Sequence, residues 1–93
     1  MKTVELQVFL DEARIELRTL EQWVAQRWVV PAETEQLELS ETDCARILLI
    51  RELKGDFGVN DEGVDLVLHL LDQLHGMRAL VASLRGELQA QDD

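Results

Sequence analysis

Three side chains in the second half of the chain have the types and spacing of a metal or acid–base site. Asp65, His69 and Asp72 follow one another at intervals of four and three residues, which places them on one face of a helix. Carboxylate and imidazole groups on one face can in principle hold a cation. No fourth ligand is identifiable, however, and soluble helices often carry such residues on their solvent side. We therefore expect no metal site and no cofactor.

Cys44 is the only cysteine, which excludes an internal disulfide and a cysteine-rich zinc site. It lies near the start of a predicted helix, where the helix dipole can stabilise a thiolate. No histidine is near it in sequence and its neighbours are largely apolar, so we expect a buried structural cysteine. Ser40 and Ser83 have no recognisable base, and there is no glycine-rich phosphate loop. The sequence predicts a protein that is not an enzyme.

Acidic residues greatly outnumber basic ones. The 93 residues include 19 acidic and 9 basic side chains, which give a formal net charge of −10. A chain with this charge repels the phosphates of nucleic acid, so nucleic acid is disfavoured as a partner. A basic protein surface is favoured instead. The alternative is an acidic surface that only keeps the protein soluble.

We predict a partner-binding acidic face in the first half of the chain. Complementary charge speeds encounter and selects partners, whereas tight binding needs apolar anchors at the centre of an interface. Trp23 or Trp28 is therefore expected as an exposed anchor within an acidic rim. The alternative places both in the core, where tryptophans at helical spacing usually lie. The predicted acidic residues are Asp11, Glu12, Glu16, Glu21, Glu33, Glu35 and Glu38.

Two short helices and a small hairpin must position this face. The alternation of Val4, Leu6 and Val8 is typical of a short strand or of the lead-in to a helix, and we favour a helix over about 7–13. Apolar periodicity predicts a second helix over about 16–27, and the two together make a helix-turn-helix. Pro31 ends the helical pattern, and the alternating run 37–39 predicts the second strand of a short hairpin or wing.

A third helix follows the predicted hairpin. Ser40 and Asp43 have the spacing of a near-capping box, which begins a helix over about 41–54. Gly55 is placed for its C-cap. In the following turn, Phe57 and Val59 are expected to fill the core.

The last third of the chain carries an uninterrupted heptad pattern. A helix over 61–91 would be on the order of 45 Å long, more than a domain of this size can bury against itself. Its first turns are broadly apolar and are expected to dock on the domain. The later half is expected to form a homodimer, the alternative being packing within the chain only. The predicted dimer seam is Leu74, Met77, Val81, Leu84 and Leu88.

These elements predict a mainly α fold within one domain. Residues 1–59 form a winged helix-turn-helix with a small β-hairpin wing, and residues 60–93 form the long coiled-coil-like C-terminal helix, which packs on the domain and on a partner chain. No segment approaches the roughly 18 apolar residues of a membrane span, and the N-terminus does not resemble a signal peptide. We expect a cytoplasmic protein that does not contact membranes.

The order of elements resembles the MerR superfamily. Residues 18–20, Arg-Thr-Leu, match the start of the recognition helix in MerR regulators. Residues 27–31, Arg-Trp-Val-Val-Pro, resemble their Gly-hydrophobic-hydrophobic-x-Pro exit, with Arg27 in place of the usual glycine. The resemblance is stronger to one branch, the chaperone modulatory protein family CbpM, through Asn60, Gly63-Val64 and the run 68–72, Leu-His-Leu-Leu-Asp.

Resemblance to CbpM implies a regulator of chaperones. CbpM proteins bind the J-domain of CbpA, a DnaJ-like co-chaperone, and block its stimulation of DnaK and its DNA binding. A J-domain engages DnaK through a basic helix, for which an acidic protein is suited to compete. A DNA reader would place several Arg, Lys or Asn side chains on the exposed face of the second helix. The predicted second helix instead offers Arg18, Glu21, Gln22 and Ala25. The alternatives are a MerR-type DNA-binding transcription regulator and a structural dimer module without regulatory role.

Overall fold

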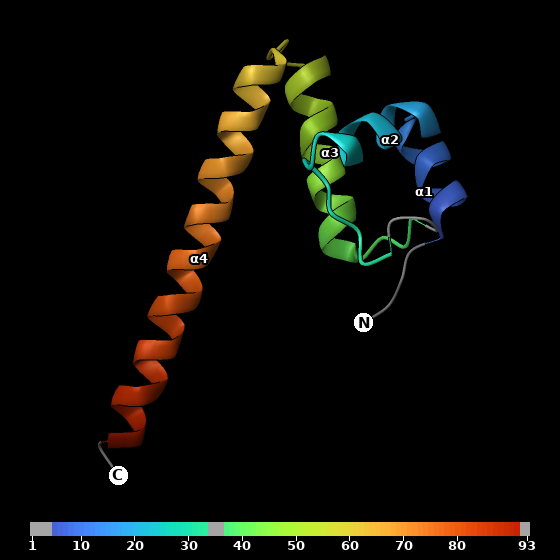
Figure 1. Ribbon diagram of the computed structural model, residues 1–93. Helices are drawn as coiled ribbons and strands as arrows, with labels where there is room; N and C mark the ends of the chain where they lie inside the picture. Colours follow the sequence, from blue (N-terminus) through green and yellow to red (C-terminus); the bar gives the residue numbers. More distant parts are fainter. Residues whose placement is uncertain (1–4, 34–36, 92–93) are drawn as a thin grey trace.

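The computed structural model describes residues 5–33 and 37–91. Four helices make up this part of the chain: α1 (Leu6–Ala13), α2 (Leu17–Ala25), α3 (Glu41–Gly55) and α4 (Asp61–Gln91). Helices α1 to α3 surround a common core, and α4 leaves them at the α3–α4 turn (Figure 1). The predicted mainly α fold, the helix-turn-helix and the long C-terminal helix are confirmed, with helix ends within two residues of those expected.

Helices α1 and α2 end in the same motif, with an arginine where glycine is usual. After α1, Arg14 has a φ of 58°, and the N–H of Ile15 bonds back to a helix carbonyl at 3.1 Å. After α2, Arg27 has a φ of 63°, and the N–H of Trp28 donates to the Trp23 carbonyl at 3.0 Å. Both are Schellman motifs, whose left-handed residue is normally glycine. Each arginine therefore occupies a backbone conformation that disfavours a side chain.

Helix α3 begins as its sequence predicts. The Ser40 Oγ accepts from the N–H of Asp43 at 3.1 Å, and the Ser40 N–H donates to the Asp43 carboxylate at 3.0 Å. This capping box gives two backbone N–H donors a side-chain acceptor each, and it fixes where the helix starts. The core side of α3 carries Cys44, Ile47 and Ile50, of which the two isoleucines are completely buried.

The turn after α3 differs from its prediction. Gly55 belongs to the helix, Asp56 is the C-cap in a right-handed conformation, and the left-handed residue is Gly58 with a φ of 63°. Phe57 was expected in the core, but its side chain is 74% exposed. The reason is that the Val59 N–H bonds back into α3 at 2.8 Å, so that Val59 packs against the core and Phe57 is left on the outside.

At the predicted β-hairpin wing, an isolated antiparallel bridge joins Glu33 and Glu38, and the described residues contain no strand. Pro31 just before the bridge has no N–H to extend a ladder. Leu39, after the bridge, is completely buried and ties this segment to the core. Residues 34–36 at the tip of the predicted wing lie outside the described part of the chain.

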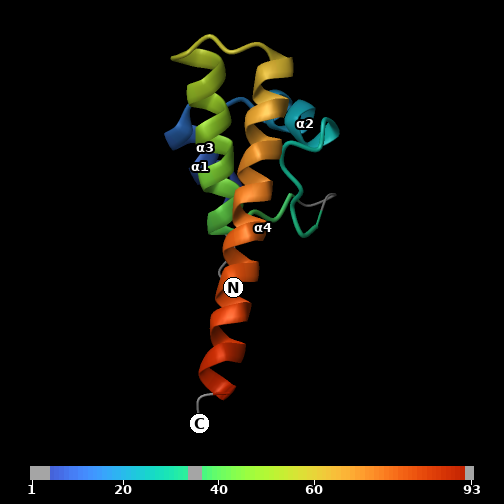
Figure 2. The same ribbon diagram turned by 90° about the vertical axis from the view of Figure 1, so that its left-hand side faces the viewer.

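Helix α4 docks on the domain through its first turns only. Val64 and Leu68 are buried and Leu71 is half-buried, whereas every described side chain from Asp72 onward is exposed. Figures 1 and 2 show the later half of α4 projecting beyond the domain. Neither α4 nor any other described helix is both long and apolar enough to cross a membrane.

Candidate protein-binding surfaces

The predicted acidic face is exposed wherever the structure describes it. Its members on and between α1 and α2 are all exposed, and Asp11 accepts one hydrogen bond from the Gln7 Nε2 at 2.9 Å. Glu33 and Glu38 are exposed at the isolated bridge, while Glu35 lies outside the described residues. The carboxylates therefore come from two parts of the fold. The described exposed members of the set are Asp11, Glu12, Glu16, Glu21, Glu33 and Glu38.

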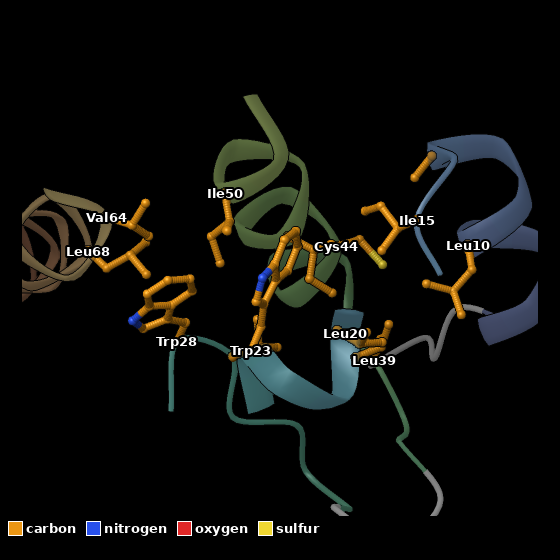
Figure 3. Close-up of a cluster of buried hydrophobic side chains, with 13 residues drawn as sticks. Leu10, Ile15, Leu20, Trp23, Trp28, Leu39, Cys44, Ile50, Val64 and Leu68 are labelled. Carbon is orange, nitrogen blue, oxygen red and sulfur yellow. The ribbon is translucent and has the colours of Figure 1, made fainter. Parts of the chain in front are cut away.

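Neither tryptophan is an exposed anchor, which corrects that prediction. Trp23 is 5% and Trp28 is 3% exposed. Trp28 lies beside Val64 and Leu68 of α4, and Trp23 lies against α3 (Figure 3). The alternative, two core tryptophans at helical spacing, is the one that the structure supports. An apolar anchor for a partner must therefore be sought elsewhere.

Trp28 instead packs between the domain and α4 (Figure 3) and helps to hold α4 in place. Its indole Nε1 donates to the Asp65 carboxylate at 3.3 Å, and its backbone carbonyl accepts a hydrogen bond from the Arg46 Nε. The Lys54 ammonium lies 5.7 Å from the centre of the indole ring, within the range of a cation–π interaction. Through its side chain and its backbone carbonyl, Trp28 thus connects the segment after α2 with both α3 and α4.

Two ion pairs link α3 and α4 on either side of Trp28. The Arg46 guanidinium donates to both carboxylate oxygens of Asp72, at 2.6 and 3.1 Å. The Lys54 ammonium pairs with Asp61 in the first turn of α4. The bidentate Arg46–Asp72 pair fixes the direction of both side chains. Because the pair joins residues that are 26 positions apart, no local sequence pattern indicates it.

These contacts also explain why Asp65, His69 and Asp72 lie on one face of α4. Asp65 and Asp72 point their carboxylates at donors of the domain, and His69 is hydrogen-bonded to Gln73 at 3.1 Å. No group of three potential metal ligands occurs in the described part of the chain. The two carboxylates hold α4 on the domain.

Replacing Asp72 by asparagine is expected to lower the free energy of unfolding at neutral pH by up to about 1 kcal/mol, because a pair this exposed is screened by solvent. Hydrogen bonds from Arg46 lower the pKa of Asp72 below its ordinary value. The carboxylate therefore stabilises the fold fully above about pH 4, and this stabilisation is lost as the pH falls through the lower folded pKa. Urea unfolding of wild type and Asp72→Asn at neutral pH and at about pH 2 measures the difference. A gap that persists in acid would contradict the assignment.

Cys44 is buried, as predicted for a structural cysteine. Burial raises the pKa of its thiol, and the nearby carboxylates of Asp43 and Glu41 raise it further. At neutral pH the side chain is a small apolar group at the start of α3 and lacks the thiolate of a nucleophile.

The predicted dimer seam is an exposed apolar stripe along α4. Met77 is 66% and Leu88 is 62% exposed, and the other seam residues are between 44% and 49% exposed. Leu66, Leu70 and Leu80 extend the same stripe beyond the predicted set. At 3.6 residues per turn, the stripe lies about a third of a turn away from the residues that dock on the domain. One chain alone does not cover it. The seam residues are Leu74, Met77, Val81, Leu84 and Leu88.

Comparison with known proteins matches the helix-turn-helix and most of α4 to a single family profile. No curated protein and no solved structure matches the chain significantly. The profile of a family described as MerR HTH family regulatory protein matches residues 4–86, which span all of α1 to α3 and most of α4. The chain therefore belongs to the MerR HTH family, which is a non-enzymatic family.

Proposed function

We propose that this protein is a dimeric adaptor that binds the J-domain of a CbpA-type co-chaperone and competes with DnaK for it. The observation that carries the proposal is the charge on the exposed side of α2, the second helix of the helix-turn-helix. That side presents Glu21 and Gln22 with a single cation, Arg18, and the carboxylates of α1 lie on the neighbouring helix. A recognition helix that enters a DNA groove would carry several Arg, Lys or Asn side chains in this position.

Net charge supports the same choice. At a net charge of −10, the field of the chain favours approach of a basic protein and opposes approach of a polyphosphate. The resemblance of residues 60–72 to CbpM proteins adds the class of partner, because those proteins act on a J-domain with a basic DnaK-binding helix. Charge complementarity would then set the rate of encounter and the choice among J-domains.

The exposed stripe of α4 supports a homodimer. Two pairs of its leucines are arranged symmetrically about Met77: Leu70 and Leu84 are equidistant from it, as are Leu66 and Leu88. In a two-fold symmetric interface, residue i contacts j and residue j contacts i. An antiparallel pair of α4 helices centred near Met77 would place each of these leucines against its equidistant counterpart. Dimerisation would also place two acidic domains at opposite ends of one rod.

Calorimetric titration with the J-domain of a CbpA-type protein from the same genome tests the proposal, with the J-domain of DnaJ as control. We expect saturable binding to the first J-domain and displacement by DnaK. Absence of binding at concentrations well above micromolar would contradict the adaptor function. Binding to duplex DNA that weakens steeply with salt would favour the MerR-type transcription regulator instead.

Charge reversal on the helix-turn-helix should weaken the complex without affecting the fold. Glu16→Lys and Glu21→Lys are each expected to raise the dissociation constant about three- to tenfold, since each carboxylate is exposed and contributes mainly through long-range charge. The matched control is Glu87→Lys, which makes the same change of charge on the projecting part of α4. Equal affinities for all three variants would remove the acidic face from the interface.

A further inference from the structure

An open groove of about 520 Å³ lies between the start of α3, the middle of α4 and the segment that follows α2. Its volume is in the range of sites that hold a few side chains or a small ligand. Figure 1 shows α3 and α4 diverging from their common turn, and the groove lies where they have separated. Apolar side chains line much of it, namely Val30, Ala45, Leu49 and Leu71.

The charged groups at the rim of this groove are not equivalent. Arg46 and Asp72 form the bidentate pair described above. The Asp43 carboxylate accepts the Ser40 N–H in the capping box of α3. Arg27 has neither a hydrogen-bonded nor an ionic side-chain partner in residues 5–33 and 37–91, and its side chain is exposed. Of the two arginines at the rim, Arg27 is therefore the one whose five N–H donors are available to a ligand, and the His75 imidazole also lines the groove.

Arg27 has a backbone conformation that is unusual for a residue with a side chain. Its φ of 63° belongs to the left-handed residue of a Schellman motif, where glycine is unstrained. Arg14 occupies the same position after α1, with a φ of 58°, but does not line the groove. The two positions thus have the same backbone conformation and the same residue type, and only Arg27 lines the groove.

We propose that this groove binds a segment of a partner protein that presents an aspartate or glutamate beside an aliphatic side chain. The aliphatic group would pack on Leu49 and Leu71, and the Arg27 guanidinium would hold the carboxylate through two parallel N–H donors. A half-exposed apolar floor suits this chemistry, together with a cation at its edge that has no partner among residues 5–33 and 37–91. It also supplies the apolar anchor that the buried tryptophans do not. The inference goes beyond the adaptor function, because it does not depend on which protein carries the segment.

Nuclear magnetic resonance of the full chain with two blocked peptides tests the groove directly. Acetyl-Leu-Asp-Leu-amide is expected to shift the amide signals of Ala45, Leu49 and Leu71 saturably in the millimolar range. Acetyl-Leu-Asn-Leu-amide has nearly the same shape without the charge, and is expected to bind at least about tenfold more weakly, since it loses the charge-assisted pair. Equal shifts with both peptides, or none with either, would overturn the proposal whatever the result with a J-domain.

Two matched variants separate binding from folding. Arg27→Gly and Arg14→Gly each remove one positive charge and one left-handed side chain, so each is expected to raise the melting temperature by a few degrees. Only Arg27→Gly is expected to lose the shifts caused by the aspartate peptide, at least about tenfold in affinity, with Arg14→Gly binding as wild type. Arg27→Lys keeps the charge without the planar fork and should retain part of the affinity. Undiminished binding by Arg27→Gly would overturn the proposal.

Discussion

Replacement of Trp28 by alanine is expected to lower the free energy of unfolding by about 3–5 kcal/mol, which is a large share of the stability of a domain of this size. The indole ring is buried against Val64 and Leu68 of α4, and its removal leaves a cavity at the junction of α2, α3 and α4. Asp65 also loses its hydrogen-bond donor. Urea unfolding followed by circular dichroism measures the change.

Trp28→Phe is the control that separates packing from hydrogen bonding. A phenyl ring keeps most of the apolar volume but has no N–H, so the loss is expected to be about 1 kcal/mol beyond the cost of repacking. The two variants also test the correction of Trp28 from exposed anchor to core residue. If Trp28→Ala retained the stability of wild type and only lost affinity for a partner, the ring would belong to a binding surface.

The helices were predictable because their signals are local. The near-capping box at Ser40 and Asp43 fixes the start of α3, and the heptad pattern fixes α4. Such signals involve residues within a turn or two of each other, so one sequence contains them completely. The wing was less predictable, since a strand needs a partner and the only described pairing is one bridge.

The direction in which aromatic side chains point was not predictable. Trp28 and Phe57 are both bulky and lie just after a helix, yet one is buried and the other is largely exposed. Trp28 is buried because α4 packs on it, whereas Phe57 is left on the outside because the Val59 N–H bonds back into α3. Glycine positions show the same limit: the sequence indicates a turn near Gly55, but the backbone places the left-handed residue at Gly58.

The candidate sites divide in the same way. Exposure of the acidic residues followed from composition and helical spacing, because most carboxylates lie on the surface unless they are paired. The Arg46–Asp72 pair and the groove beside Arg27 depend on residues far apart in the chain meeting in space. The one sequence signal for the groove was Arg27 itself, which stands where MerR relatives usually carry glycine. Arg14 has the same left-handed conformation without lining the groove, so the backbone alone does not single out Arg27, and its position beside the groove does.

Leu84→Glu is expected to convert the proposed dimer to monomers, with a dissociation constant at least about a hundredfold higher, because each copy would bury a carboxylate in an apolar seam. Leu84 is about half exposed in one chain, so the fold of the isolated chain should be unchanged. Ser83→Glu introduces the same charge at the adjacent exposed position outside the seam and serves as the control. Sedimentation equilibrium measures both variants. A wild-type chain that remains monomeric at hundreds of micromolar would contradict the dimer.

Cysteine cross-linking then distinguishes the two orientations of the dimer. Two Met77→Cys chains should form a disulfide with each other if the helices are antiparallel, because the two-fold axis passes near this residue. Leu88→Cys should not, since its copies would lie about 33 Å apart along the rod, far beyond the few ångströms that a disulfide spans. Efficient cross-linking of Leu88→Cys would show a parallel seam. The native Cys44 need not be removed, because burial keeps its thiol away from solvent and raises its pKa.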